Sequence, residues 1–442
     1  MAMTDTVLLS PDAGDARDSH HYLEAVAHLG DKRAVTTEAA IYSENGIKLI
    51  DKGARIDSRL YGRLLEHKLR DPLDRHLTVE DAVTPAVVLG VATHLIENDP
   101  LPRLLAASLG GAEALLEPVH KLQLPNPIAF KLTVMREQQP DLFRHSVQMT
   151  LVALYLGLRT GLEPAPCVEL ATAALLHDVG VLHMDPAWRD PSHRMSGMER
   201  KHLVAHPVTA MLLLRDQGGY GKEVEIAVLE HHERLDGSGY PRGLKDAQIS
   251  RLGRILMLAE VVSAFYEKFD ASAGQRLSLV LRLNHRKFDP ALMACVLPLL
   301  QGEPAPESLS TFGTEAQRQI GQLTQAFDQW AELKAGIPAA ELGEGPVTPC
   351  RLIDQRLAAL ARVLTEAGSY PSQAAELLDM FEDDAQTLAE VRLMGHEALW
   401  QLQGVANACQ RRWPDLGTRP RVSRGDAAAA DWCGRMQGLL AA

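Results

Sequence analysis

The sequence predicts a mainly α-helical protein built from several parts. Apolar residues recur at three- and four-residue steps through most of the chain, which is typical of amphipathic helices. Asn45-Gly46 lies between two short apolar runs, which predicts a β-hairpin near the N-terminus. A Gly- and Pro-containing segment from Gly302 separates two helical regions. We therefore expect a small α/β N-terminal module, an all-helical central domain and a helical C-terminal extension.

Length and composition limit the classes of protein to consider. The 442 residues suffice for two or three domains, and 46% hydrophobic with 23% charged residues is typical of a globular protein with a real core. The net charge of -12 argues against binding a nucleic-acid polymer, which usually needs a basic surface. It does not exclude a small anionic substrate, because a metal site supplies its own positive charge.

The cysteines and the apolar runs suggest a compartment. The five cysteines are scattered without a CxxC pair, which argues against a disulfide framework and against a zinc knuckle. No uninterrupted apolar run approaches the roughly 18 residues of a membrane helix, and the start of the chain is acidic. We therefore expect a cytoplasmic protein with no membrane segment.

The N-terminal part divides into a leader and a module. Residues 1–31 are polar and rich in Asp and His, so we expect a flexible leader. Residues 32–123 should form the α/β module, with the hairpin strands at 40–42 and 47–50. A helix should begin near Ser58 and continue through Leu69.

Two helical regions follow. The central domain should span residues 124–302, and Ser196-x-x-Glu199 is a capping box that opens one of its helices. The C-terminal extension should span residues 308–442. Its apolar steps from Leu377 to Cys409 favour an intrachain helical bundle over an intermolecular coiled coil. A homodimer, or a protein partner bound through these helices, stays open.

Candidate metal ligands are concentrated in the central domain. A single helical histidine is usually a core or surface residue, but here there are four places together: His145, His177-Asp178, His206 and His231-His232. Imidazole and carboxylate groups together suit divalent iron or manganese, and two such ions can clamp a phosphate and activate a water. Asp141 lies one helical turn before His145, so it could extend the ligand set or be a solvated first-turn carboxylate.

These motifs resemble those of a known family. Leu175-Leu-His-Asp-Val-Gly180, Ala205-His-Pro207 and the block from Glu230 to Leu244, with its HHE and DGSGYP, are similar to the HD-GYP family over roughly residues 125–300. The resemblance implies an all-helical phosphodiesterase domain with two or three metal ions that hydrolyses cyclic di-GMP to pGpG or GMP.

The resemblance also implies a ligand set. It assigns metal ligation to His145, His177, Asp178, His206, His231 and His232, with His177 and Asp178 as the catalytic pair. Glu260 stands where the family has an aspartate, and Asp141 stands where trinuclear members have a glutamate.

Three departures from the family concern the substrate. Val181 replaces the lysine of the family's HDxGK motif, the residues after Glu260 lack the usual acidic run, and the basic stretch that follows is replaced by residues 267–274. Arg242 and Lys245 are candidate phosphate contacts, or else ordinary surface charges. Three functions therefore stay open: a cyclic di-GMP phosphodiesterase, a catalytically weakened signalling or partner-binding module, and a phosphohydrolase of another nucleotide.

Overall fold

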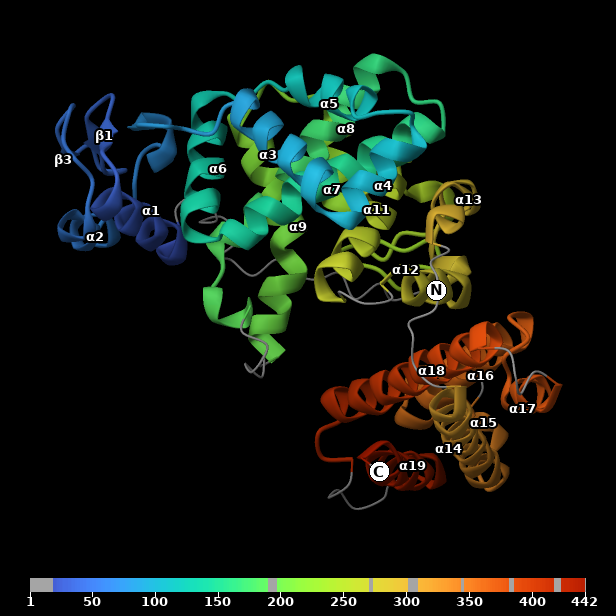
Figure 1. Cartoon of the computed structure of the whole chain (residues 1–442). Helices are drawn as coiled ribbons and strands as arrows, with labels where there is room; N and C mark the ends of the chain where they lie inside the picture. Colours follow the sequence, from blue (N-terminus) through green and yellow to red (C-terminus); the bar gives the residue numbers. More distant parts are fainter. Residues whose placement is uncertain are drawn as a thin grey trace. The chain divides into compact units, whose positions relative to one another are not determined.

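The computed structural model describes residues 19–189, 197–269, 273–300, 309–342, 346–380, 385–416 and 423–441. The chain divides into two compact units, each treated by itself below (Figure 1). The first contains residues 1–268 and 286–299, and the second contains residues 269–285 and 300–442.

The first unit begins with a small mixed part. Its elements are α1 (His20–Lys32), β1 (Val35–Thr37), β2 (Ile41–Tyr42), β3 (Lys48–Ile50), α2 (Ser58–Leu65), η2 (Leu73–His76) and β4 (Leu77–Val79). Strand β1 pairs antiparallel with β4, and β2 pairs antiparallel with β3. The α/β composition of this part therefore agrees with the sequence analysis, although α2 ends at Leu65 rather than continuing through Leu69.

The hairpin at Asn45-Gly46 is confirmed. Ile41 pairs with Ile50 and Tyr42 with Lys48, and the turn is closed by a bond from the Gly46 amide to the Ser43 carbonyl (2.9 Å). Gly46 adopts a φ of 79°, a left-handed conformation that a glycine reaches without a steric cost.

The flexible leader expected at residues 1–31 is wrong from residue 20 onwards. The Ser19 hydroxyl caps α1 by accepting a hydrogen bond from the Tyr22 amide (3.3 Å), and Tyr22, Val26 and Leu29 are fully buried. Helix α1 packs against α2 and α6. Its apolar residues, spaced three and four apart, therefore form a packed face. Residues 1–18 lie outside the described part of the chain.

Helices form the rest of the first unit. They are α3 (Pro85–Asn98), α4 (Pro100–Ser108), α5 (Glu113–His120), α6 (Asn126–Gln138), α7 (Pro140–Arg159), α8 (Pro164–Leu176), η3 (Val179–His183), η4 (Pro186–Arg189), α9 (Gly197–Gln217), α10 (Lys222–Glu230), η5 (Asp246–Gln248), α11 (Arg251–Lys268), η6 (His285–Lys287), α13 (Pro290–Val296) and η7 (Leu297–Leu300). Ser196, the predicted capping residue of α9, lies outside the described residues.

The core of this unit is formed by α7, α8, α10 and α11, which pack against one another. Helices α3 and α4 pack on α7, and α5 packs on α7 and α8 (Figure 1). The boundary expected at residue 123 therefore cuts through a packed group of helices, so the helical domain begins earlier than the sequence analysis placed it.

One stretch, Pro164–His183, is long and apolar enough to cross a membrane by composition. It comprises α8 and η3, and 72% of its most apolar window is buried inside the protein. Because it packs on α7 and α10, we assign it as a core helix of this unit.

The second unit is a helical bundle. Its helices are α12 (Ala273–Leu283), α14 (Leu309–Ala335), α15 (Ala339–Leu342), α16 (Pro349–Glu366), α17 (Pro371–Met380), α18 (Ala385–Arg412) and α19 (Arg424–Ala441). Helix α18 packs on α14, α16 and α19 of the same chain, with Ala398 and Leu402 fully buried. The intrachain bundle is thus confirmed. The boundary expected at 302 is wrong for α12, because Leu279 and Leu283 belong to this bundle's core.

Candidate metal centre

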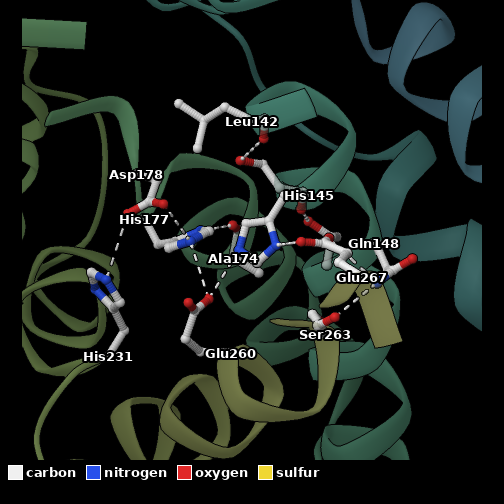
Figure 2. Close-up of polar contacts among 12 residues, drawn as sticks. Leu142, His145, Gln148, Ala174, His177, Asp178, His231, Glu260, Ser263 and Glu267 are labelled. Carbon is white, nitrogen blue, oxygen red and sulfur yellow. Dashed lines mark hydrogen bonds and ion pairs between the residues drawn. The ribbon is translucent and has the colours of Figure 1, made fainter. Parts of the chain in front are cut away.

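Five helices of the first unit end or pass at one place and bring seven polar side chains together. They come from five separate segments of the sequence, and Figure 2 labels five of the seven side chains. They are His145 on α7, His177 and Asp178 at the end of α8, His206 on α9, His231 and His232 at the end of α10, and Glu260 on α11.

Asp178 lies in the middle of this cluster. Its Oδ1 is 3.1 Å from Nε2 of His206 and 3.7 Å from Nε2 of His231. Its Oδ2 is 3.3 Å from Nε2 of His177. The two oxygens of one carboxylate therefore face different histidines, which is the arrangement that a ligand shared between two ions requires.

Glu260 completes one side of the cluster. Its Oε2 lies 3.0 Å from Nε2 of His145 and 3.5 Å from Nε2 of His177. The additional methylene group, compared with an aspartate, does not turn the carboxylate away. Burial alone would raise the pKa of Glu260, but the adjacent imidazoles of His145 and His177 outweigh this effect and hold the pKa well below its usual range.

The possible ligand atoms fall into three overlapping groups. Within each group these atoms lie within 4.8 Å of one another. The groups are His145, His177 and Glu260; His177, Asp178 and His231; and His206, His231 and His232. Because they share members, the groups form one continuous centre with room for more than one ion.

The hydrogen bonds of three histidines show that this donor set suits a cation. Nδ1 of His177, His206 and His231 lies 2.7, 2.6 and 2.6 Å from the backbone carbonyl three residues earlier. A carbonyl only accepts, so Nδ1 must carry the proton and Nε2 presents a lone pair. Nε2 of His206 and Nε2 of His231 are nevertheless only 3.1 Å apart. Two lone pairs this close repel each other unless a positive charge lies between them.

Two further atoms support the same conclusion. Among the described residues, His177 Nε2 and Asp178 Oδ1 are buried side-chain atoms with no hydrogen-bond partner. Such atoms are costly to bury, and a metal ion is a common explanation for them in native proteins. The residues present therefore fit divalent metal ions.

The protonation state of His231 and His232 also favours ligation. Burial and the neighbouring imidazoles hold the pKa of His231 well below its usual value, and burial with the charge of His206 lowers the pKa of His232 to about 3. Both rings are therefore neutral at physiological pH, which is the form that binds a metal.

A glycine allows Asp178 to approach His206. A Cβ at Gly180 would collide with the backbone carbonyl oxygen of His206 and would lie 2.8 Å from the amide nitrogen of Ala210. Helix η3 therefore lies directly on α9, and only a glycine permits this contact.

The loop after His232 is held by the buried carboxylate of Glu233. Glu233 accepts hydrogen bonds from the amides of Arg242 (2.8 Å) and Leu244 (2.9 Å). Tyr240 stacks on the His232 ring, with 4.7 Å between their centroids. The segment that contains the DGSGYP motif therefore forms a loop that covers one side of the cluster.

The two predicted phosphate contacts have other contacts in the structure. Arg242 Nη2 is 2.6 Å from Oε1 of Glu230, whose side chain is 3% exposed. The carbon chain of Lys245 lies against Gly237. These contacts hold the loop, and both side chains remain exposed, so contact of Arg242 or Lys245 with a substrate stays a prediction.

One predicted ligand needs correction. Asp141 is exposed in the first turn of α7 and belongs to none of the ligand groups found among the described residues, which agrees with the alternative of a solvated carboxylate. Val181, which stands where the family has a lysine, is 2% exposed and therefore buried.

Glu267 was not predicted from the sequence, and its carboxylate lies 2.9 and 3.0 Å from Nδ1 of His145 (Figure 2). Glu267 lies seven residues after Glu260 on α11, two helical turns away, so both project from the same face. The seven-residue spacing can be read from the sequence, but only the structure shows that Glu267 contacts His145.

Comparison with known proteins agrees with the motifs. The family model of the HD domain matches residues 114–292. The chain is 26% identical over 165 residues to a cyclic di-GMP phosphodiesterase, PdeB, of Borreliella burgdorferi, and 33% identical over 156 residues to a cyclic di-GMP phosphodiesterase of Pseudomonas aeruginosa. It is 23% identical over 243 residues to a 3′3′-cGAMP-specific phosphodiesterase of Vibrio cholerae.

These similarities are partial. They cover 36%, 35% and 52% of this chain in the three cases. They cover 43%, 37% and 53% of the relatives, so the chain spans about half of their length or less.

Proposed function

We propose that this chain, a member of the HD domain family with the motifs of the HD-GYP type, is a metal-dependent phosphodiesterase that hydrolyses cyclic di-GMP to pGpG or GMP. The observation that carries the proposal is the convergence of six imidazole and carboxylate groups around Asp178, contributed by five helices. The relatives named as cyclic di-GMP phosphodiesterases support the choice of substrate.

Bound divalent ions, iron or manganese, would supply the activated water and neutralise the phosphate oxygens. The residues of this chain have three tasks. His145, His177 and Glu260 would hold one ion, and His206, His231 and His232 would hold the other. Asp178 would bridge both, because its two oxygens face different histidines. The buried setting of His231 and His232 keeps these two imidazoles neutral and ready to bind.

A second substrate deserves direct comparison. Two relatives are named 3′3′-cGAMP-specific phosphodiesterases, and the similarity to one of them spans 52% of this chain. The two cyclic dinucleotides differ in one base and have the same phosphodiester chemistry. A metal centre that acts on the phosphates does not by itself choose between them.

The alternative of a weakened or purely binding module rests on the substrate side of the site. Val181 is buried where a lysine was expected, and Arg242 is paired with Glu230. Losing one cation that contacts a phosphate typically reduces turnover by about 100-fold, whereas losing the metals removes the activity. We therefore propose a slow enzyme.

The setting of the activity is part of the same proposal. We place the enzyme in the cytoplasm, where its five cysteines, all within the described residues, would remain the free thiols they are in the structure. The C-terminal bundle would supply the contact with a second copy or with a protein partner.

The test is a hydrolysis assay with full-length protein purified anaerobically. Cyclic di-GMP, 3′3′-cGAMP and bis-p-nitrophenyl phosphate are compared, with Asp178→Asn as the inactive control. We expect cyclic di-GMP to be hydrolysed fastest and Asp178→Asn to lose at least about 100-fold in rate. Metal-loaded protein that hydrolyses none of the three would support the binding module instead.

A further inference from the structure

His145 is held at both ring nitrogens by carboxylates of α11. Its Nε2 lies 3.0 Å from Oε2 of Glu260, and its Nδ1 lies 2.9 and 3.0 Å from the two oxygens of Glu267 (Figure 2). Glu260 belongs to the metal centre described above, whereas Glu267 lies on the far side of the ring.

This contact distinguishes His145 from three other histidines of the centre. Nδ1 of His177, His206 and His231 binds the backbone carbonyl three residues earlier. For His145 that carbonyl belongs to Leu142, and it accepts a hydrogen bond from the Ser146 hydroxyl at 3.0 Å (Figure 2). The acceptor for Nδ1 of His145 therefore comes from a side chain of another helix.

We propose that Glu267 is a positioning residue for His145. By accepting the Nδ1 proton, Glu267 fixes the tautomer in which Nε2 carries the lone pair, and it holds the ring so that Nε2 faces the metal position beside Glu260. The inference rests on the proposed metal centre, and it adds to that centre a residue that acts only through His145.

Glu267 is itself supported. The buried amide of Gln148, one turn after His145 on α7, donates to the backbone carbonyl of Ser263 (3.3 Å) and to Oε1 of Glu267 (3.4 Å). This amide bridges α7 and α11 beside the His145 ring. The Glu267 side chain is 31% exposed, so its charge can be removed without opening the core.

A carboxylate bonded to the far nitrogen also makes the near nitrogen a stronger ligand. Loss of such a partner typically weakens metal binding by 10–100-fold. We expect Glu267→Ala to raise the dissociation constant for Mn²⁺ by about 10-fold. Glu267→Gln should have a smaller effect, because its amide oxygen still accepts from Nδ1 but carries no charge.

The experiment measures Mn²⁺ binding to metal-free, full-length protein by calorimetry for the wild type, Glu267→Ala and Glu267→Gln. Glu225→Gln is the matched control, because this substitution also removes an ion pair, the one between Glu225 and Arg215 (2.9 Å). Within the described part of the chain, Glu225 does not contact the metal cluster. Melting temperatures of the metal-free proteins are measured in parallel. Turnover of cyclic di-GMP is measured at low and at saturating Mn²⁺.

We expect the affinity for Mn²⁺ to decrease from the wild type to Glu267→Gln and further to Glu267→Ala. Glu225→Gln should bind Mn²⁺ like the wild type. Turnover of Glu267→Ala should fall at low Mn²⁺ and return towards the wild-type value at saturating Mn²⁺. If the wild type binds Mn²⁺ and Glu267→Ala binds it with the same affinity, the role of Glu267 is overturned, whereas the proposed metal centre is not. Absence of Mn²⁺ binding by the wild type overturns the proposed function and this inference together.

Discussion

Val181 follows the His177-Asp178 pair by three residues and lies in η3, where 2% of its surface is exposed. A lysine at this position would have to bury its ammonium group or disturb the packing of η3. We predict that Val181→Lys lowers the free energy of unfolding by on the order of 3 kcal/mol and does not increase turnover. Urea unfolding and a hydrolysis assay of the variant check this. A faster enzyme of unchanged stability would show that the side chain reaches the substrate phosphate.

Arg242 gives a second prediction at the scale of a residue. Its guanidinium pairs with the buried carboxylate of Glu230, which precedes His231, and the Arg242 side chain is 44% exposed. Arg242→Gln should lower the free energy of unfolding by about 1–2 kcal/mol while KM stays near its wild-type value.

The matched control is Arg59→Gln, because Arg59 pairs with Asp57 but its side chain is 90% exposed, so its loss should change stability little. A large rise in KM for Arg242→Gln, without a loss of stability, would instead show that Arg242 contacts the substrate.

The motifs and the family resemblance singled out seven side chains that the structure brings together, whereas Asp141, the eighth candidate, lies outside the cluster. The partners of those residues could not be predicted. Arg242 stands twelve residues after Glu230, and Glu267 stands 122 residues after His145. Neither pairing follows from residue type or spacing, because each depends on how a loop or a second helix is placed.

Helix α1 and the short helix η3 form a contact at the scale of elements. The Tyr22 ring stacks on His183 at 4.6 Å between centroids, the Ser19 hydroxyl is 3.3 Å from Nδ1 of His183, and the Lys131 ammonium lies 4.3 Å from the Tyr22 centroid. Lys131 also pairs with the buried carboxylate of Asp74. Since η3 continues directly from Asp178, this contact ties the N-terminal part to the metal centre.

The contact predicts a pH dependence. Burial, and then the charge of Lys131, hold the pKa of His183 well below its usual value. The folded protein therefore keeps His183 neutral, whereas the unfolded chain takes up a proton below about pH 6.5. Stability is consequently lost as the pH falls below that value, at up to about 1.4 kcal/mol per pH unit for this histidine.

His183→Phe keeps a ring against Tyr22 and removes the titrating group. The free energy of unfolding of this variant should fall less steeply than that of the wild type between pH 6.5 and pH 5. Urea unfolding of both proteins in the presence of a chelator measures the two slopes. Equal slopes would mean that His183 is protonated in the folded state over this range.

Element prediction succeeded where local rules dominate. The Asn45-Gly46 hairpin follows from a turn that needs a glycine at a φ of 79°, and α18 follows from its apolar steps. Helix α1 was missed because its polar residues suggested a leader, although Tyr22, Val26 and Leu29 already had helical spacing. Their burial depends on α2 and α6, which the sequence of α1 does not reveal.

The whole molecule has two compact units, and neither internal boundary follows from linker composition. The break expected at 123, between the N-terminal module and the central domain, separates α3, α4 and α5 from α7, on which they pack. The break expected at 302 assigns α12 to the central domain, although Leu279 and Leu283 lie in the core of the second unit. Prolines and glycines mark where a chain turns, but shared cores decide which helices form a unit.

The central claim for the whole protein is that one continuous centre holds two metal ions. The most direct test is the metal content per chain of full-length protein purified anaerobically, measured for the wild type, His145→Ala and His206→Ala. His145 and His206 belong to different ligand groups that Asp178 joins. We predict two iron or manganese ions per chain in the wild type and about one in each variant. A wild type that retains no metal, or two variants that both keep the full wild-type content, would contradict the account.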